Sequence, residues 1–175
     1  MVVVGCGPIG IGIIGLCKYL SAEVVAIDVN EHRLNVVKEQ FEADHIINAT
    51  KNPVEKVAEV TEGKLAQQVF DASGNKRAIE MGHEYMRHGG NYVLVGLYKE
   101  ELSFLHPKIH AKETTLMCSR NATLEDFEFV MKVLGEKKFN TASYITNQVP
   151  FEKILTDMDS WASADSLNIK VISSL

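Results

Sequence analysis

The sequence predicts an α/β fold built on a doubly wound, parallel, six-stranded sheet with helices on both faces. Short apolar runs typical of buried strands alternate with segments of helical periodicity, and the connections between them are short. A glycine-rich turn follows the first apolar run. Neighbouring parallel strands need a crossover long enough to hold a helix, so regular alternation indicates this class of fold.

The first three strands and two helices are the clearest. VVVG (2–5) is a short buried-strand run, and PIGIGIIGLCKYL (8–20) follows with apolar residues at helical spacing. EVVAID (23–28) is a second strand and HRLNVVKEQF (32–41) a second helix. HIIN (45–48) completes this part as a third strand.

The alternation continues through the middle of the chain. PVEKVAEVT (53–61) is a helix with proline in its first turn, where the missing N–H costs little. QQVFDAS (67–73) is the fourth strand, and Asn75 caps a helix that runs to about Met86. NYVLVGL (91–97) is the fifth strand, after a His-Gly-Gly turn.

After Gly96 the alternation of strands and helices becomes less regular. LSF (102–104) predicts a short edge strand, TTLMCS (114–119) the sixth parallel strand and LEDFEFVMKVLGE (124–136) an amphipathic helix. The rest divides into SYITNQV, a helix over 151–164 and a strand over 167–175, and periodicity does not show which sheet this tail joins. We therefore expect a domain over 1–140 and a tail over 141–175.

Composition narrows the class of function. A chain of 175 residues can bury roughly 70% of its unfolded surface as a single domain. A net charge of −5 without a basic block argues against nucleic-acid binding, and no apolar run reaches the roughly 20 residues of a membrane span. The three cysteines are far apart and form no CxxC pair, so we expect no disulfide, no metal site and a reducing, cytoplasmic setting.

The string GCGPIG is a GxGxxG motif of the dinucleotide-binding, or Rossmann, type. It follows a strand, opens a helix, and is followed about 20 residues on by Asp28 at the end of the next strand. Gly5 makes the tight turn, Gly7 lets a pyrophosphate approach the backbone and Gly10 lets the helix pack closely on the strand. Asp28 accepts hydrogen bonds from both ribose hydroxyls and repels a 2′-phosphate, which favours NAD over NADP. The alternative is a structural turn with a chance surface aspartate.

Further candidates lie at the predicted carboxyl ends of strands, where open α/β sheets bind ligands. Asp71-Ala72-Ser73-Gly74 ends the fourth strand and Val95-Gly96-Leu97 ends the fifth, and their small residues let a ribose and nicotinamide pass over the backbone. The alternative is that these glycines only make turns. Arg33 either stacks on the adenine or is an ordinary solvated arginine.

The sequence offers no catalytic machinery. A dehydrogenase needs a zinc, a Tyr/Lys pair or a His/Asp pair to polarise an alcohol and take its proton, and none is evident. His106 and His110 are four residues apart, but Pro107 lies between them and no third ligand accompanies them. Cys6 lies inside the glycine turn, where we expect it to pack as a small apolar side chain.

At this point the chain resembles the nucleotide-binding half of medium-chain, zinc-type alcohol and polyol dehydrogenases. The resemblance rests on VVVGCGPIGIG, VVAIDVNEHRL, EADHIIN, VFDASGN, GGNYVLVGL and KETTLMCSRNATLEDFEFVMKVL, and continues through YITNQVPFEKI to the terminal IKVI. It is closest to L-galactonate oxidoreductase-like and starvation-sensing dehydrogenase-like members. One departure is ITNQ (145–148), where relatives often carry ITH and a basic residue.

The resemblance implies which residues contact the cofactor. By this carry-over the pyrophosphate is lined by Gly5, Gly7, Pro8, Ile9 and Gly10, with Lys170 nearby; Asp28 binds the adenosine ribose and Arg33 lies beside the adenine; Ser73, Gly74, Val95, Gly96 and Leu97 flank the nicotinamide half. It implies no catalytic and no metal residue within the chain.

The resemblance also implies what accompanies the chain. In the family a GroES-like catalytic domain precedes the nucleotide domain and holds the zinc, so we expect a fragment that begins at the first Rossmann strand and binds NAD(H) but does not catalyse. The implied substrate of the whole enzyme is a small-molecule alcohol. The tail would pack on the absent domain and expose apolar surface without it. The implied oligomer is a homodimer through the edge strand at 102–104.

Two other functions remain open from the sequence. A stand-alone NAD-sensing module would let nucleotide occupancy alter a partner interface without chemistry. A methyltransferase uses a similar glycine turn and ribose acid, although the second half of the chain continues the pattern that flanks a nicotinamide.

Overall fold

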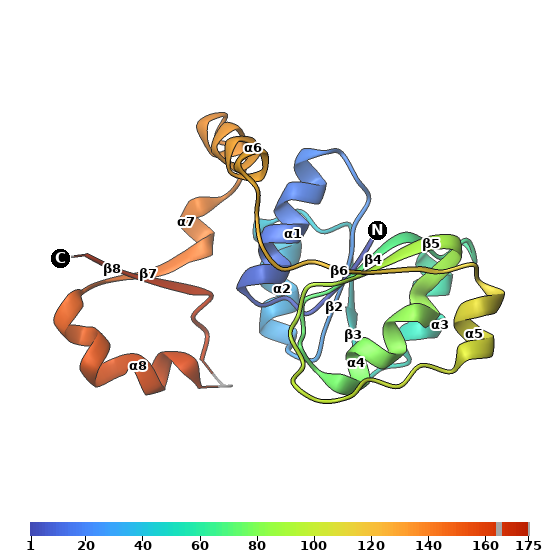
Figure 1. The fold of residues 1–175 in the computed structure, drawn as a ribbon. Coiled ribbons are helices and arrows are strands. Elements are labelled where there is room, and N and C mark those ends of the chain that lie inside the picture. Colours follow the sequence, from blue (N-terminus) through green and yellow to red (C-terminus); the bar gives the residue numbers. More distant parts are fainter. Residues whose placement is uncertain (164–165, 175) are drawn as a thin grey trace.

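A computed structural model describes residues 1–163 and 166–174, and its central element is a six-stranded sheet with the order β3-β2-β1-β4-β5-β6 (Figure 1). Every neighbouring pair in this sheet is parallel. The strands are β1 (Val2–Val4), β2 (Val25–Asp28), β3 (His45–Asn48), β4 (Ala66–Asp71), β5 (Met86–Leu94) and β6 (Thr115–Cys118). This confirms the predicted doubly wound α/β class.

The helices connect the strands in sequence order. They are α1 (Pro8–Tyr19), α2 (Glu31–Gln40), α3 (Pro53–Val60), α4 (Lys76–Met81) with the 3₁₀ turn η1 (Gly82–Tyr85), α5 (His106–Ala111) and α6 (Leu124–Gly135). The side chains of Asn30 and Asn75 cap α2 and α4 by accepting hydrogen bonds from the N3 amides. Among the described residues no helix is both long and apolar enough to cross a membrane.

Strand β1 lies at the centre of the sheet and decides where a ligand can bind. Val4 pairs with Ile27 of β2 on one side and with Asp71 of β4 on the other. The chain therefore winds from β1 toward β3 in its first part and from β4 toward β6 in its second. In such sheets ligands bind outside the carboxyl ends of the strands at this reversal.

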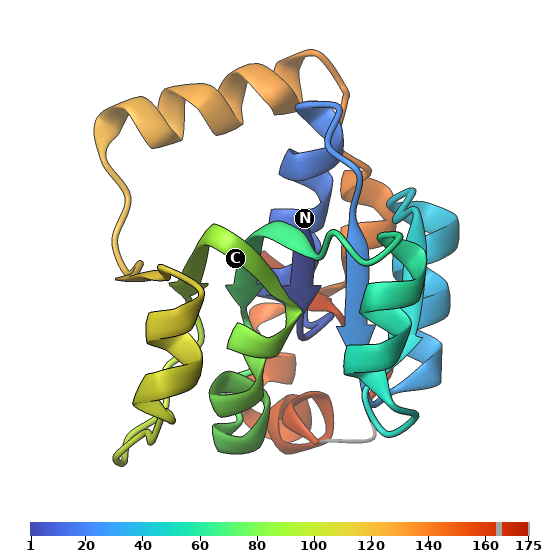
Figure 2. The same ribbon diagram turned by 90° about the vertical axis from the view of Figure 1, so that its right-hand side faces the viewer.

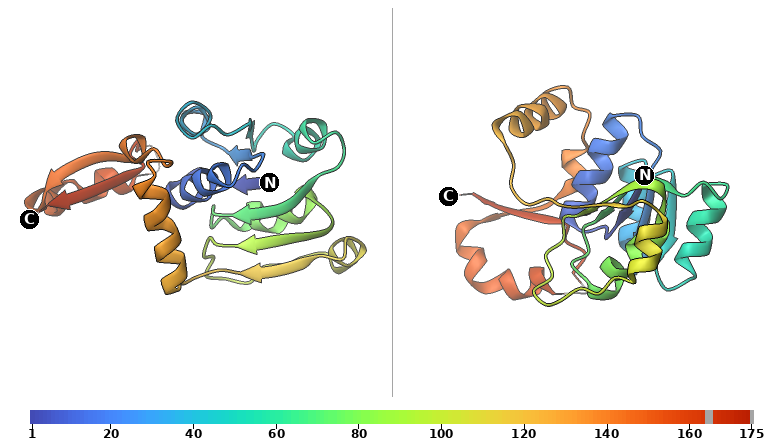
Figure 3. Two further views of the ribbon diagram at one scale, coloured as in Figure 1. Left: turned by 90° about the horizontal axis from the view of Figure 1, so that it is seen from above. Right: turned by 45° about the vertical axis from the view of Figure 1, so that its right-hand side comes forward.

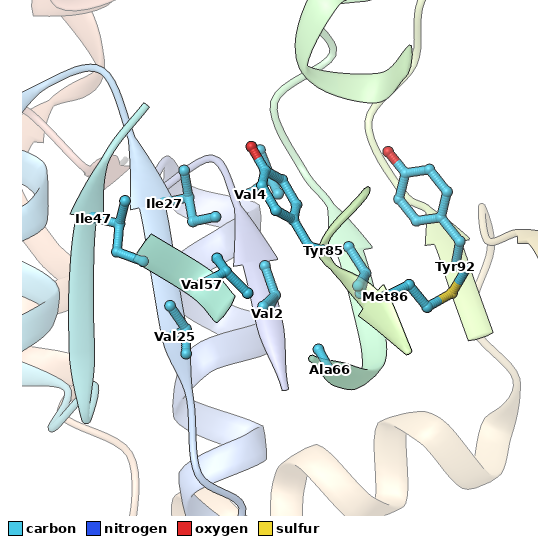
Figure 4. Packing of buried hydrophobic residues seen from close by; sticks show 11 residues of the cluster. Val2, Val4, Val25, Ile27, Ile47, Val57, Ala66, Tyr85, Met86 and Tyr92 are labelled. Carbon is cyan, nitrogen blue, oxygen red and sulfur yellow. The ribbon is translucent and has the colours of Figure 1, made fainter. Parts of the chain in front are cut away.

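The central strands β1 and β2 are buried on both faces, whereas the edge strand β6 is exposed. Successive side chains of a strand point to opposite faces, so Val3 packs in one apolar cluster while Val2 and Val4 pack in the other. The Val3 cluster includes residues of α1 and α2. The second cluster, drawn in Figure 4, includes Val57 of α3 and the aromatic rings of Tyr85 and Tyr92. Helices thus cover both faces, as the doubly wound class requires.

The tail forms a second, two-stranded parallel sheet, which answers a question that periodicity left open. After α7 (Thr141–Tyr144), β7 (Ile145–Pro150) pairs with β8 (Lys170–Ser174), and η2 (Phe151–Lys153) and α8 (Ile154–Ala162) connect them. Figure 3 shows this tail set to one side of the main sheet, with α6 between the two. Residues 164–165 and 175, which the sequence placed in the last helix and strand, lie outside the described residues.

The predicted edge strand at 102–104 is not a strand of this sheet. The segment pairs with no strand among the described residues of the single chain, and β6 is the edge of the sheet. The Ser103 amide instead donates to the Glu80 carboxylate at 2.8 Å, and Phe104 packs against the core and the ring of His83. Extended sequence alone does not make a strand when no partner backbone lies beside it.

Several boundaries also differ from expectation. Strands β4 and β5 end at Asp71 and Leu94, so the residues expected to end them form loops at the carboxyl edge. The helix predicted to reach Met86 ends at Met81 and tightens into η1. Helix α5 is one that we had not predicted; Figure 2 shows it in yellow, with α6 in orange across the top of the view.

Candidate cofactor site

The glycine turn connects β1 to α1 through a tight backbone path. Gly5 has φ +94°, a conformation that side-chain-bearing residues rarely adopt, and its amide donates to the Ile27 carbonyl at 2.8 Å. A Cβ at Gly5 would lie 2.8 Å from the Ser73 amide nitrogen, and one at Gly10 would collide with the Gly5 carbonyl oxygen. Both glycines are therefore required by close packing of the backbone.

Gly7 differs from the other two glycines because nothing lies within 4 Å of the position of its missing Cβ. It is the N-cap of α1 and has no side chain to accept a hydrogen bond from the first turn. The helix begins at Pro8, which has no N–H, and the remaining amides of the first turn have no partner within the helix and carry its partial positive charge. The turn is therefore a suitable place for an anionic group such as a pyrophosphate.

Asp28 is the last residue of β2, and two backbone amides hold its carboxylate. Cys6, in the glycine turn, donates to Oδ2 at 2.6 Å, and Asn30 donates to Oδ1 at 2.8 Å. The side chain is largely buried, yet it lines a cavity. Because two carboxylate oxygens can accept about four hydrogen bonds, capacity remains for a ligand with adjacent hydroxyl groups.

The cavity has a volume of about 410 Å³ and brings together parts of the four loops that follow β1, β2, β3 and β4. It is lined by Val4, Gly5, Gly7, Ile27, Asp28, Val29, Arg33, Ala49, Ala72, Ser73, Asn75, Arg77 and Ala78. Five residues that we predicted from the sequence therefore share one cavity. Arg77 was missed because an exposed arginine in the first turn of a helix carries no spacing signal of its own.

The remaining predicted residues lie around this cavity without lining it. Ile9 and Leu97 are exposed apolar side chains at the carboxyl edge of the sheet, Leu97 by 80%. Lys170 and Pro8 line a neighbouring cavity of about 410 Å³ between the tail and the start of α1. The tail also contacts this helix end directly, because the Tyr144 hydroxyl donates to the Pro8 carbonyl at 3.2 Å.

The loops after β4 and β5 touch one another. A Cβ at Gly74, which has φ +61°, would lie 3.1 Å from the Leu97 carbonyl oxygen, and one at Gly96 would lie 2.5 Å from the Gly74 nitrogen. The Val95 and Gly96 amides both donate to the Asp71 carbonyl, at 2.9 and 2.8 Å. The structure thus brings Ser73–Gly74 and Val95–Leu97 together as one surface beside the cavity.

Asp71 is a residue of this surface whose role the sequence did not reveal. It is fully buried, and its carboxylate accepts hydrogen bonds from the Ser73 amide at 3.0 Å, the Ser73 hydroxyl at 2.9 Å and the Gly74 amide at 3.3 Å. Burial raises the pKa of this carboxyl group, although the three donors oppose the shift. The strand pattern marked Asp71 only as the start of a small-residue turn.

Side chains that commonly bind metals do not cluster in the described part of the chain. No cluster of three or more His, Cys, Asp or Glu side chains there could hold a metal ion. His106 and His110 lie on α5 with ring centroids 5.3 Å apart, without a third ligand. Cys6 is buried, and burial together with the nearby Asp28 charge raises the pKa of its thiol, so it does not form a ready nucleophile.

Comparison with known proteins shows which of them have a similar sequence. L-galactonate-5-dehydrogenase of Escherichia coli K12 is 39% identical over 151 residues, covering 86% of this chain and 44% of that protein. D-xylulose reductase of Saccharomyces cerevisiae is 29% identical over 177 residues, covering 98% of this chain and 49% of that protein. The chain therefore spans about half the length of these curated relatives.

Solved structures agree on the fold. An alcohol dehydrogenase of E. coli CFT073 in complex with NADH superposes with a TM-score of 0.89 at 23% identity, covering 99% of this chain and 51% of that one. L-idonate 5-dehydrogenase of E. coli K-12 gives a TM-score of 0.88 at 24% identity, covering 99% and 49%. The family model described as "Zinc-binding dehydrogenase" matches residues 8–136, most of the chain. The chain belongs to the zinc-binding dehydrogenase family.

Proposed function

We propose that this chain is the NAD(H)-binding domain of a zinc-type dehydrogenase that oxidises a secondary alcohol of a polyol or sugar acid. The observation that carries the proposal is the Asp28 carboxylate, which two backbone amides fix at one end of a cavity that also reaches the glycine turn. Relatives named for L-galactonate, D-xylulose and sorbitol support this class of substrate for the whole protein.

In the proposed complex, the described residues contact three parts of the cofactor: the adenosine, the pyrophosphate and the nicotinamide half. Asp28 accepts hydrogen bonds from the adenosine ribose hydroxyls, and the free amides at the start of α1 receive the pyrophosphate. Half-buried Arg33 lies beside the adenine, where its guanidinium stacks on the ring. The loops Ser73–Gly74 and Val95–Leu97 accept the nicotinamide half, and Lys170 faces the pyrophosphate from the tail.

The cofactor, when bound, supplies a hydride acceptor at its nicotinamide ring. The residues of this chain bind and orient it and keep the ring over the loops after β4 and β5. The described residues do not fit a zinc site, so we assign no step that needs zinc to this chain. We infer that the isolated 175-residue chain binds NAD(H) without oxidising alcohols.

Calorimetry with NADH, NADPH and ADP-ribose tests the proposal. We expect NADH and ADP-ribose to bind, and NADPH to bind at least about tenfold more weakly because its 2′-phosphate faces the Asp28 carboxylate. An alcohol-oxidation assay on the same sample should show no turnover. A chain that binds none of the three ligands, or that prefers NADPH, would contradict the proposed site, and turnover by this chain would contradict the assignment of chemistry elsewhere.

A further inference from the structure

Asp71 is a buried carboxyl group that has no basic partner among the described residues. Its side chain is fully buried at the end of β4, and no lysine, arginine or histidine of the described residues forms an ion pair with it. The groups that do contact its carboxylate are the amides of Ser73 and Gly74 and the Ser73 hydroxyl. Hydrogen-bond donors of this kind favour the ionised carboxylate, which can only accept.

The same residue also holds the neighbouring loop. Its main-chain carbonyl accepts from the Val95 and Gly96 amides, and a Cβ at Gly96 would lie 3.0 Å from Asp71 Oδ1. The carboxylate therefore lies directly against the backbone of Gly96. Through its side chain and its carbonyl, Asp71 fixes both loops that end β4 and β5.

The position of Asp71 relative to a bound cofactor follows from the sheet order, given the proposed function. Asp28 fixes the adenosine beside β2, and the glycine turn after β1 receives the pyrophosphate. A dinucleotide lies across the reversal of strand order, so its other half extends over the carboxyl ends of β4 and β5. The nicotinamide ring then lies on the surface that covers Asp71.

We propose that Asp71 is a positioning residue that shapes the nicotinamide subsite and that its uncompensated charge favours the oxidised cofactor over the reduced one. The oxidised nicotinamide ring is a cation and the reduced ring is neutral. A buried negative charge with little solvent screening attracts the cation and leaves the neutral ring almost unaffected. The residue thereby sets the relative affinity of the site for NAD⁺ and NADH.

The test compares three ligands on two forms of the 175-residue chain. Asp71→Asn keeps the shape of the side chain and one oxygen acceptor but removes the charge. Calorimetry should give an unchanged affinity for ADP-ribose, within about twofold, and a loss of NAD⁺ affinity about fivefold to tenfold larger than any change for NADH. Asp44→Asn removes an acid that contacts Val24 ahead of β2, away from the glycine turn, and should leave the NAD⁺ to NADH ratio unchanged.

The outcomes separate charge, structure and the proposed function. An unchanged NAD⁺ to NADH ratio in Asp71→Asn would overturn the inference while the proposed function stands. Equal losses for all three ligands would show a general structural role and would also overturn it. Wild-type protein that binds no ligand would overturn the proposed function together with the inference. Asp71→Ser, a smaller neutral variant, gives the same comparison if Asp71→Asn does not fold.

Discussion

The substitution Asp28→Asn tests the geometry of the cofactor site most directly. It changes no volume, but it replaces a carboxylate that has two acceptor oxygens with an amide that has one. In the structure one oxygen accepts from the Cys6 amide at 2.6 Å and the other from the Asn30 amide at 2.8 Å. The new NH₂ group must therefore face one of two backbone donors.

The magnitudes follow from these contacts. Leaving one buried amide unsatisfied costs about 1–3 kcal/mol of the free energy of unfolding. Losing charge-assisted bonds to the ribose costs about 1.5–3 kcal/mol of binding free energy, or roughly a 10- to 150-fold weaker affinity for NADH. The affinity for NADPH should rise, because Arg33 and Arg77 line the same cavity and the carboxylate no longer opposes a 2′-phosphate.

Urea denaturation and calorimetry on Asp28→Asn and Asp44→Asn separate stability from binding. Asp44 is a matched control because its carboxylate also accepts from a backbone amide, that of Val24 at 2.7 Å, and it lies away from the glycine turn. We expect Asp44→Asn to lose stability and keep its affinity for NADH. The reasoning fails if folded Asp28→Asn binds NADH within about twofold of wild type, or if Asp44→Asn weakens binding equally.

Three further predictions concern stability. Gly10→Ala should lower the free energy of unfolding by at least about 1–3 kcal/mol and weaken NADH binding, because its Cβ collides with the backbone. Gly12→Ala on the same helix has open space around its Cβ, so in urea denaturation it should be neutral or stabilising. Tyr92→Phe should lower the free energy of unfolding by about 1–3 kcal/mol, because the Tyr92 hydroxyl donates to a buried carbonyl at 2.6 Å. Tyr85→Phe should leave it unchanged, since the Tyr85 hydroxyl has no partner among the described residues. Burial alone would raise the pKa of Asp44, but hydrogen bonds from Lys18 and a backbone amide lower it below its ordinary 3.8. The difference in the free energy of unfolding between wild type and Asp44→Asn should therefore persist above that pH. It should shrink as the pH falls through the lower pKa of the folded state.

The parts of the fold that the sequence predicted share a local physical cause. Strand and helix periods, the two asparagine caps and the glycine turn are all properties of a few consecutive residues, and apart from the strand at 102–104 each strand they predicted in the main sheet is present. The predicted strand at 102–104 failed because pairing depends on a partner backbone that lies far away in the sequence. The pairing of β7 with β8 was hidden for the same reason.

The candidate site was predictable to the extent that it is fixed by sequence spacing. Asp28 follows the glycine turn at a separation that the geometry of a strand-helix-strand unit determines, so its place at the cavity was foreseeable. Arg77 enters the cavity only because the loop after β4 folds back toward the turn. That approach depends on contacts between Gly5 and Ser73, which no local pattern encodes.

Asp28 and Asp71 show why spacing finds one acid and not the other. Both lie at the ends of strands that flank β1, and backbone amides hold both carboxylates. Asp28 keeps a face on the cavity, so a ligand can compete for its remaining acceptor capacity, and a motif built on ligand contact includes it. Asp71 is closed off by the two loops that it organises, so it acts on a ligand only through its charge and through the shape of those loops. A residue of that kind is not part of a motif that can be recognised by its spacing in the sequence. Its contribution has to be inferred from hydrogen bonds and burial in the folded chain.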